Sequence, residues 1–111
     1  MENQETILCA AIWYKDLPLK KEIPQTLLRP KNIDCGVVFC GYRHPHCMYT
    51  MVAVTGLRSV ENAEDGAGRQ VQGFLTNKNR FVNRREAAKI WIEQGNQLKY
   101  SDDELFSEDL Y

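Results

Sequence analysis

Arginines and aromatic rings are the side chains of this sequence best suited to binding a ligand. Between Arg69 and Lys99 seven basic residues meet two acidic ones. A guanidinium binds a phosphate through two parallel hydrogen bonds, and an aromatic ring stacks on a nucleobase. The pattern therefore predicts a site for a planar ligand that carries phosphates. Its candidate residues are Arg43, His44, Arg69, Phe74, Asn77, Arg80, Phe81 and Arg84.

The two phenylalanines are the candidate stacking platforms of this predicted site. A phenylalanine is by default more often part of a core than of a ligand platform. Phe74 departs from that default because Gln72 and Thr76, its neighbours on the same strand face, are polar. We therefore expect Phe74 to lie at an interface or against a planar ligand. The four arginines are the expected phosphate ligands, and His44 and Asn77 the expected neutral donors.

The segment after the apolar run that ends at residue 40 holds Arg43, His44 and His46 around Pro45, and a helix is expected to begin there. Free backbone N–H groups at a helix start favour an anion, which makes this segment a candidate phosphate cradle. An equally open interpretation is that His44 only caps the helix and that Arg43 pairs with an acid.

Metal and catalytic chemistry are less well supported. Cys35, Cys40, His44, His46 and Cys47 are residue types that bind zinc. Cys35 and Cys40, however, have opposite parity on one predicted strand and would point to opposite faces, so we expect no metal. Cys47 beside a histidine lacks a third orienting group, and the sequence has no Walker loop. We therefore expect a protein without cofactor or catalytic residues.

The elements that must position these residues follow from periodicity and from turn residues. Apolar runs and alternation predict strands near 6–14, 33–40 and 69–76, and apolar residues at helical spacing predict helices near 46–55 and 84–94, although the β-branched residues of the first of these two segments leave a strand open there. The segment 77–79 predicts a turn, and Asn83 with Glu86 predicts a capping box at the start of the second helix. Gly56 and Gly95 are the predicted helix ends, and His44 is the predicted N-cap of the first helix. The fold class predicted is α+β, with a small, mainly antiparallel sheet and two packed helices.

Length and composition bound the remaining possibilities. The 111 residues predict one domain, 1–111, with an acidic tail over 101–111 that docks in part because it holds apolar residues. The net charge of −1 argues against binding a nucleic acid polymer. No segment is apolar enough for a membrane span, and four cysteines without a leader indicate a reducing cytoplasm. Prolines predict a loop over 17–31 with an extended piece at 25–28.

Four short motifs together resemble a known family of small phage proteins. They are Gly41-x-Arg43-His44-x-His46-Cys47, Gln72-Gly73-Phe74-Leu75-Thr76, Arg80-Phe81-Val82-x-Arg84-x-Glu86-Ala87 and Leu105-x-Ser107-Glu108-Asp109-Leu110-Tyr111. In this order they look like the first-described type of Thoeris anti-defence protein, a cyclic nucleotide sponge.

The resemblance implies a non-enzymatic protein of the host cell cytoplasm. Such sponges bind glycosyl-cyclic ADP-ribose signals without cleaving them, and some members bind cyclic oligonucleotides. The resemblance also implies a homo-oligomer, a dimer or a hexamer made of dimers, with ligands at the subunit junctions. A small core independently favours a ligand site between subunits.

Two other functions remain open from the residues alone. One is a small enzyme that acts on a nucleotide, with His44 or His46 as acid or base. The other is a phage accessory protein that contacts a host protein through its acidic tail.

Overall fold

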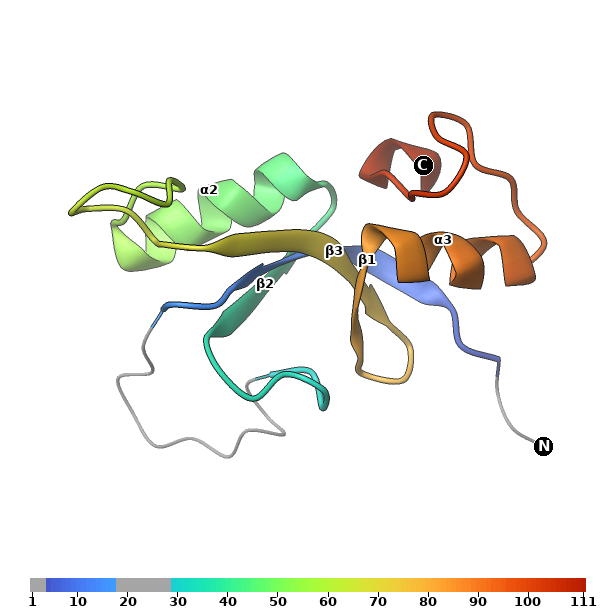
Figure 1. Cartoon of the computed structure of the whole chain (residues 1–111), viewed down its shortest axis with the longest axis horizontal. Helices are drawn as coiled ribbons and strands as arrows, with labels where there is room; N and C mark the ends of the chain where they lie inside the picture. Colours follow the sequence, from blue (N-terminus) through green and yellow to red (C-terminus); the bar gives the residue numbers. More distant parts are fainter. Residues whose placement is uncertain (1–3, 18–28) are drawn as a thin grey trace.

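A four-stranded antiparallel sheet organises the structure, a computed structural model that describes residues 4–17 and 29–111. The elements are β1 (Ile7–Tyr14), β2 (Val37–Gly41), α2 (His44–Thr55), β3 (Gln70–Thr76), β4 (Phe81–Asn83), α3 (Arg84–Glu93) and the 3₁₀ turn η1 (Ser107–Asp109). The strand order is β2-β1-β3-β4, and every neighbouring pair is antiparallel. Both α-helices lie over the same face of the sheet (Figure 1). The predicted α+β fold is therefore confirmed.

The main core lies between the sheet and the two helices. The central strand β1 contributes Ala10, Ile12 and Tyr14, each fully buried. From α2, Cys47 and Met51 pack against them, and α3 adds Ala87, Ala88 and Ile90. Ile90 is buried, and Trp91 beside it packs partly buried against the same core.

A second, smaller core covers the opposite face of the sheet. Ala11 from β1, Phe81 from β4 and Ile33 from the segment before β2 form its buried centre. Asn32 fixes that segment, because its side chain accepts a hydrogen bond from the Phe81 backbone N–H (2.8 Å) and donates one to the Phe81 carbonyl (2.7 Å). Since β1 is covered on both faces, its run of apolar residues is continuous rather than alternating.

The structure corrects the predicted environment of β3. Side chains alternate along this strand as expected, but the face that carries Phe74 is the face covered by the helices. Phe74 is therefore fully buried, 0% exposed, and the expectation of an aromatic ring on a polar, exposed face is wrong. Polar Gln72 and Thr76 share that face because each finds a partner there, Arg84 and Glu5 respectively.

Local signals placed most element ends correctly. Asn79 has a left-handed φ of 57°, Gly56 ends α2 with φ 75°, and Asn83 caps α3 by accepting from the Glu86 N–H at 2.8 Å. The N-cap of α2 is Arg43, however, not His44, because the backbone of Arg43 is extended and His44 already belongs to the helix. Strand β2 also begins at residue 37 rather than 33, after Gly36 turns the chain with φ 72°.

The C-terminal segment 105–111 docks onto the rest of the structure, as predicted, and its residues Leu105, Ser107 and Asp109 are buried. The extended piece predicted at 25–28 lies outside the described residues. In the described part of the chain, no helix is both long and apolar enough to cross a membrane.

Candidate functional site

The N-terminal ends of α2 and α3 both contact the C-terminal segment 105–111. Arg43, the N-cap of α2, donates from Nη1 to the carbonyl of Ser107 at 2.8 Å. At the start of α3, the Arg84 carbonyl accepts from the Leu105 N–H at 2.9 Å. Figure 1 shows the 3₁₀ turn η1 on the helix side of the sheet, beside these two helix ends. We call Tyr42, Arg43, Gln72, Arg84, Phe106 and Tyr111 the double-arginine site.

One half of the double-arginine site is a stack of two exposed rings beside Arg43. The rings of Tyr42 and Tyr111 lie 4.3 Å apart between centroids and are nearly parallel, at 11°. The Arg43 guanidinium lies 5.2 Å from the Tyr42 ring centre and 5.6 Å from that of Tyr111. Such distances allow cation–π attraction to both rings.

The other half is Arg84 between Gln72 and Phe106. The guanidinium carbon lies 4.7 Å from the centre of the Phe106 ring, and Nη2 donates to the side-chain carbonyl of Gln72. The Nε atom of Arg84 is buried and has no hydrogen-bond partner in the described part of the chain. A shallow pocket of about 290 Å³, lined by Tyr100, Phe106 and Glu108, borders this ring.

The charges of Arg43 and Arg84 are not paired with any acid in the part of the chain that the structure describes. Among residues 4–17 and 29–111, ion pairs within 4.0 Å involve Arg58, Arg69, Arg80 and Arg85, and neither arginine of the site takes part in one. Their partners are a backbone carbonyl and an amide, which leave the positive charge in place. The double-arginine site can therefore accept an anion without breaking an ion pair among the described residues.

His44 and Phe74 lie beneath the double-arginine site and support it. The two rings meet edge to face at 5.2 Å, and the Nε2 atom of His44 lies 2.9 Å from the Gly73 carbonyl. Because a carbonyl only accepts, Nε2 carries the proton. Burial lowers the pKa of His44 below its ordinary value of 6.5, so the ring is neutral at pH 7. His44 therefore attaches the start of α2 to β3 through a bond inside the protein.

Arg80 and Asn77 make their contacts at the turn between β3 and β4, with the segment that precedes β1. Arg80 donates to both carboxylate oxygens of Glu5, at 2.8 and 2.9 Å, and lies 3.4 Å from Glu86. The Arg80 hydrogen bonds lower the pKa of Glu5 to about 2. The Asn77 side chain accepts from the Thr6 N–H at 2.8 Å. These predicted ligand residues instead hold the N-terminal segment to the hairpin.

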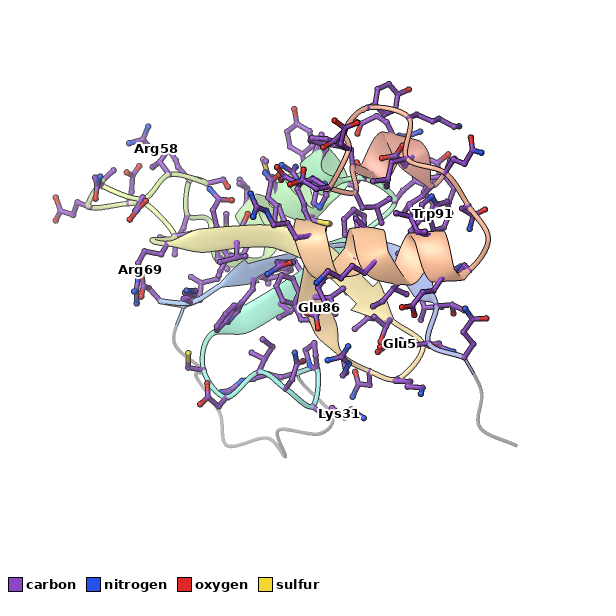
Figure 2. The ribbon with its side chains drawn as sticks, turned by 45° about the vertical axis from the view of Figure 1, so that its right-hand side comes forward. Glu5, Lys31, Arg58, Arg69, Glu86 and Trp91 are labelled. Atoms are coloured by element: carbon purple, nitrogen blue, oxygen red, sulfur yellow. The ribbon has the colours of Figure 1, made fainter. Side chains whose placement is uncertain are left out.

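Arg69 and Phe81 also lie away from the double-arginine site. Arg69 forms an exposed ion pair with Asp16 (2.7 Å), and its hydrogen bonds lower the pKa of Asp16 to about 2. Figure 2 shows Arg69 and Glu5 toward opposite ends of the molecule. Phe81, 6% exposed, packs edge to face against Trp13 on the face opposite Phe74. The structure thus brings together Arg43, His44, Phe74 and Arg84 and separates them from the other four predicted residues.

Four residues of the double-arginine site were missed by sequence reasoning: Tyr42, Gln72, Phe106 and Tyr111. One signal for Tyr42 was its position next to Arg43, directly before the helix. The signal for Phe106 and Tyr111 was the presence of rings in an acidic tail, which predicted docking but not the place of docking.

The cysteines lie apart from this site or beneath it. All four are free thiols, and no cluster of three potential metal ligands occurs in the part of the chain that the structure describes. Cys9 and Cys40 are neighbours on β1 and β2, where a hydrogen bond from Cys40 lowers the pKa of the Cys9 thiol to about 7. Cys47 is buried against β1, and burial raises its pKa to about 11, which leaves it a poor nucleophile.

Fold and site define a small α+β protein in which Arg43 and Arg84, neither paired with an acid among the described residues, lie beside aromatic rings. The chain matches the phage T4 y16D protein family over residues 6–111, nearly its whole length, and it belongs to that family of phage proteins. No curated protein and no solved structure matches the chain.

Proposed function

We propose that this phage protein sequesters a cyclic nucleotide immune signal in the host cytoplasm, without cleaving it. The signal is of the glycosyl-cyclic ADP-ribose type or a cyclic oligonucleotide, as the motif resemblance implies. The observation that carries the proposal is the pair Arg43 and Arg84, each in contact with an aromatic ring and neither in an ion pair among the described residues.

This arrangement provides what a phosphate-bearing planar ligand needs. Each guanidinium has five N–H donors, and among the described residues one of them donates to a protein acceptor in each case: the Ser107 carbonyl for Arg43 and the Gln72 side chain for Arg84. The free donors of Arg43 and those of Arg84 other than its buried Nε can reach phosphate oxygens, and the exposed rings beside Arg43 can stack on a base.

Capture rather than turnover is supported by the state of His44. His44 is buried and neutral, and its Nε2 proton is committed to the Gly73 carbonyl, which keeps it from acting as an acid or base on a bound ligand. His46 is exposed on the first turn of α2, with the edge of its ring against Tyr42.

We further propose that the protein acts as a homo-oligomer, a dimer or a hexamer, through the outer face of α2. Residues 44–57 include no Asp, Glu, Lys or Arg, and apolar side chains occupy both faces of the helix. On the outer face Tyr49 is 75% and Val54 70% exposed. An uncharged face suits a second copy of itself, because a two-fold interface places like against like.

Ligand retention and release test the proposed function directly. The purified protein is incubated with cyclic ADP-ribose or with a cyclic tri-adenylate, separated from free ligand, and heated, and the released molecule is identified by chromatography. A sponge returns the molecule intact in stoichiometric amount. Release of a hydrolysed product would identify an enzyme instead, and retention of neither ligand would count against sequestration of these signals.

A matched pair of variants links retention to the site. Arg43→Gln removes an unpaired guanidinium and should lower retention at least tenfold, because a charge-assisted bond contributes roughly 1.5–3 kcal/mol. Arg58→Gln is the control, since Arg58 is exposed and paired with Asp65 away from the site. Equal retention by both variants would remove Arg43 from the proposed site.

A further inference from the structure

The stack of Tyr42 and Tyr111 is the feature that the proposed function leaves unexplained. Two exposed tyrosines lie parallel at stacking distance, with a guanidinium near both rings. Parallel stacking beside an arginine is also the geometry in which a protein holds a nucleobase.

The two rings of the stack are held very differently. Tyr42 lies directly between β2 and α2, and its neighbour Arg43 caps the helix. Up to Leu110 the C-terminal segment is also fixed: Asp109 accepts from the N–H groups of Lys99 (2.8 Å) and Phe106 (2.9 Å), and Leu110 packs against the main core.

Tyr111 follows directly on this anchor but shares little of it. Its ring is 51% exposed, and its side chain forms no hydrogen bond with the rest of the described chain. It stacks on the Tyr42 ring and lies near the Arg43 guanidinium. Rotation of this one side chain would uncover Tyr42 while the segment before it stays docked.

We propose that Tyr42 and Arg43 form the platform for the base of a nucleotide, and that Tyr111 occupies this platform until the base displaces it. The proposal rests on the proposed function and adds to it the residue that stacks on the base and a gate on its access. The ligand class is a planar base joined to a phosphate: the base replaces the Tyr111 ring, and the phosphate takes free donors of Arg43.

Titration with adenosine 5′-monophosphate tests the platform without any cyclic signal. Binding is followed by NMR of the full chain, through the ring protons of Tyr42 and Tyr111, and yields a Kd for each variant. Tyr42→Ala should weaken binding roughly ten- to hundredfold, since stacking on an aromatic side chain contributes about that much per base. Tyr42→Phe, which keeps the ring, should bind as the unchanged protein does.

The gate predicts an effect of opposite sign for Tyr111. Tyr111→Ala removes the competing ring and should tighten binding about two- to tenfold, the range typical of one aromatic pair. Weaker or unchanged binding by Tyr111→Ala would overturn the gate. The matched control is Ile92→Ala, which removes an exposed apolar side chain from α3, outside both the platform and the outer face of α2, and should leave the Kd unchanged.

Ribose 5-phosphate separates recognition of the base from recognition of the phosphate. It should bind at least tenfold more weakly than the monophosphate nucleotide, and equal affinity would overturn the platform.

Failure of this inference is also distinguishable from failure of the proposed function. If Tyr42→Ala retains a cyclic signal as well as the unchanged protein does, the platform is wrong and sequestration stands. If no cyclic signal is retained but the monophosphate binds through Tyr42, the platform stands alone.

Discussion

Phe74 shows how one side chain connects the core to the double-arginine site. It is fully buried, it touches His44 edge to face, and its strand neighbour Gly73 supplies the carbonyl that His44 binds. Gly73 itself must lack a side chain, because a Cβ there would lie 2.2 Å from the Val82 carbonyl. A change at Phe74 is therefore transmitted to the start of α2, where Arg43 is placed.

We predict that Phe74→Ala lowers the free energy of unfolding by roughly 3–5 kcal/mol, as truncation of a buried phenylalanine usually does. Urea unfolding followed by circular dichroism measures this loss. Ile92→Ala is the control because that side chain is exposed on α3, outside the proposed interface, and it should cost less than about 0.5 kcal/mol. A loss at Phe74 as small as the control's would show that the ring is not part of the core.

His44 predicts a dependence of stability on pH. Its folded pKa is depressed by burial, so below its ordinary value of 6.5 the unfolded chain binds a proton that the folded chain does not. His44 therefore contributes nothing to the pH dependence of stability above about pH 6.5, and the free energy of unfolding falls as the pH is lowered from about 6.5 towards the folded pKa. The stabilisation that comes from the Glu5 carboxylate declines only below about pH 4.5, so the effects of His44 and Glu5 on stability fall in different pH ranges.

Melting temperatures between pH 7.5 and 5 measure the contribution of this histidine. The unchanged protein should lose stability across this range, whereas His44→Gln, which cannot titrate, should show a flatter profile. His46→Gln, a change at an exposed histidine two residues away, is the comparison variant. Identical slopes for His44→Gln and the unchanged protein would contradict the assignment.

At the scale of elements, the segment before β1 depends on one ion pair with the β3–β4 turn. The side chains of Glu5 and Arg80 are 18% and 30% exposed, and Glu5 also accepts from the Thr76 hydroxyl at 2.8 Å. We predict that Glu5→Gln lowers the free energy of unfolding by roughly 1–2 kcal/mol, since bonds to a charged group in a partly exposed position are lost.

The Glu5–Arg80 ion pair also determines how stability changes at acidic pH. Because the folded pKa of Glu5 is about 2, its stabilisation is present above about pH 4.5 and is lost as the pH falls towards 2. Acid unfolding curves should therefore separate the unchanged protein from Glu5→Gln above pH 4.5 and converge below it. Glu93→Gln, at an exposed position on α3, is the control. Curves that stay apart at pH 2 would argue against an electrostatic cause.

Element types were predictable because their signals are local. Asn83 with Glu86, Gly56 and Gly95 mark helix ends through bonds and φ angles that span a few residues. The environment of Phe74 was not predictable in this way. Polar neighbours implied an exposed face, but Gln72 is satisfied by Arg84, 12 residues later on the next helix, and Thr76 by Glu5, 71 residues earlier in the chain.

At the scale of the whole molecule, the site was only half predictable for the same reason. Positive charge between residues 69 and 99 was evident, but Arg69 and Arg80 are neutralised by Asp16 and Glu5, more than fifty residues earlier in the chain. Arg43 and Arg84 remain unpaired among the described residues because the tail offers them rings and carbonyls. Which cations stay available is thus a property of tertiary contacts.

The outer face of α2 leads to the last prediction, which concerns assembly. A helix that is apolar on every side is normally buried on every side, and the sheet covers only the side with Cys47 and Met51. We predict that at micromolar concentration the protein sediments as a species larger than the 12.8 kDa chain. Val54→Glu should shift it towards the monomer, because a two-fold contact brings the introduced charge near its own copy.

Ile92→Glu provides the matched control for this prediction. Ile92 is 52% exposed on α3, so the same change there adds the same charge to a comparable apolar position outside the proposed interface. Sedimentation equilibrium on both variants and on the unchanged protein decides the question. If the unchanged protein is a single 12.8 kDa species, or if Ile92→Glu dissociates it while Val54→Glu does not, α2 does not form the interface. If only Val54→Glu dissociates it, loss of signal retention in that variant would indicate a ligand site that needs a second subunit.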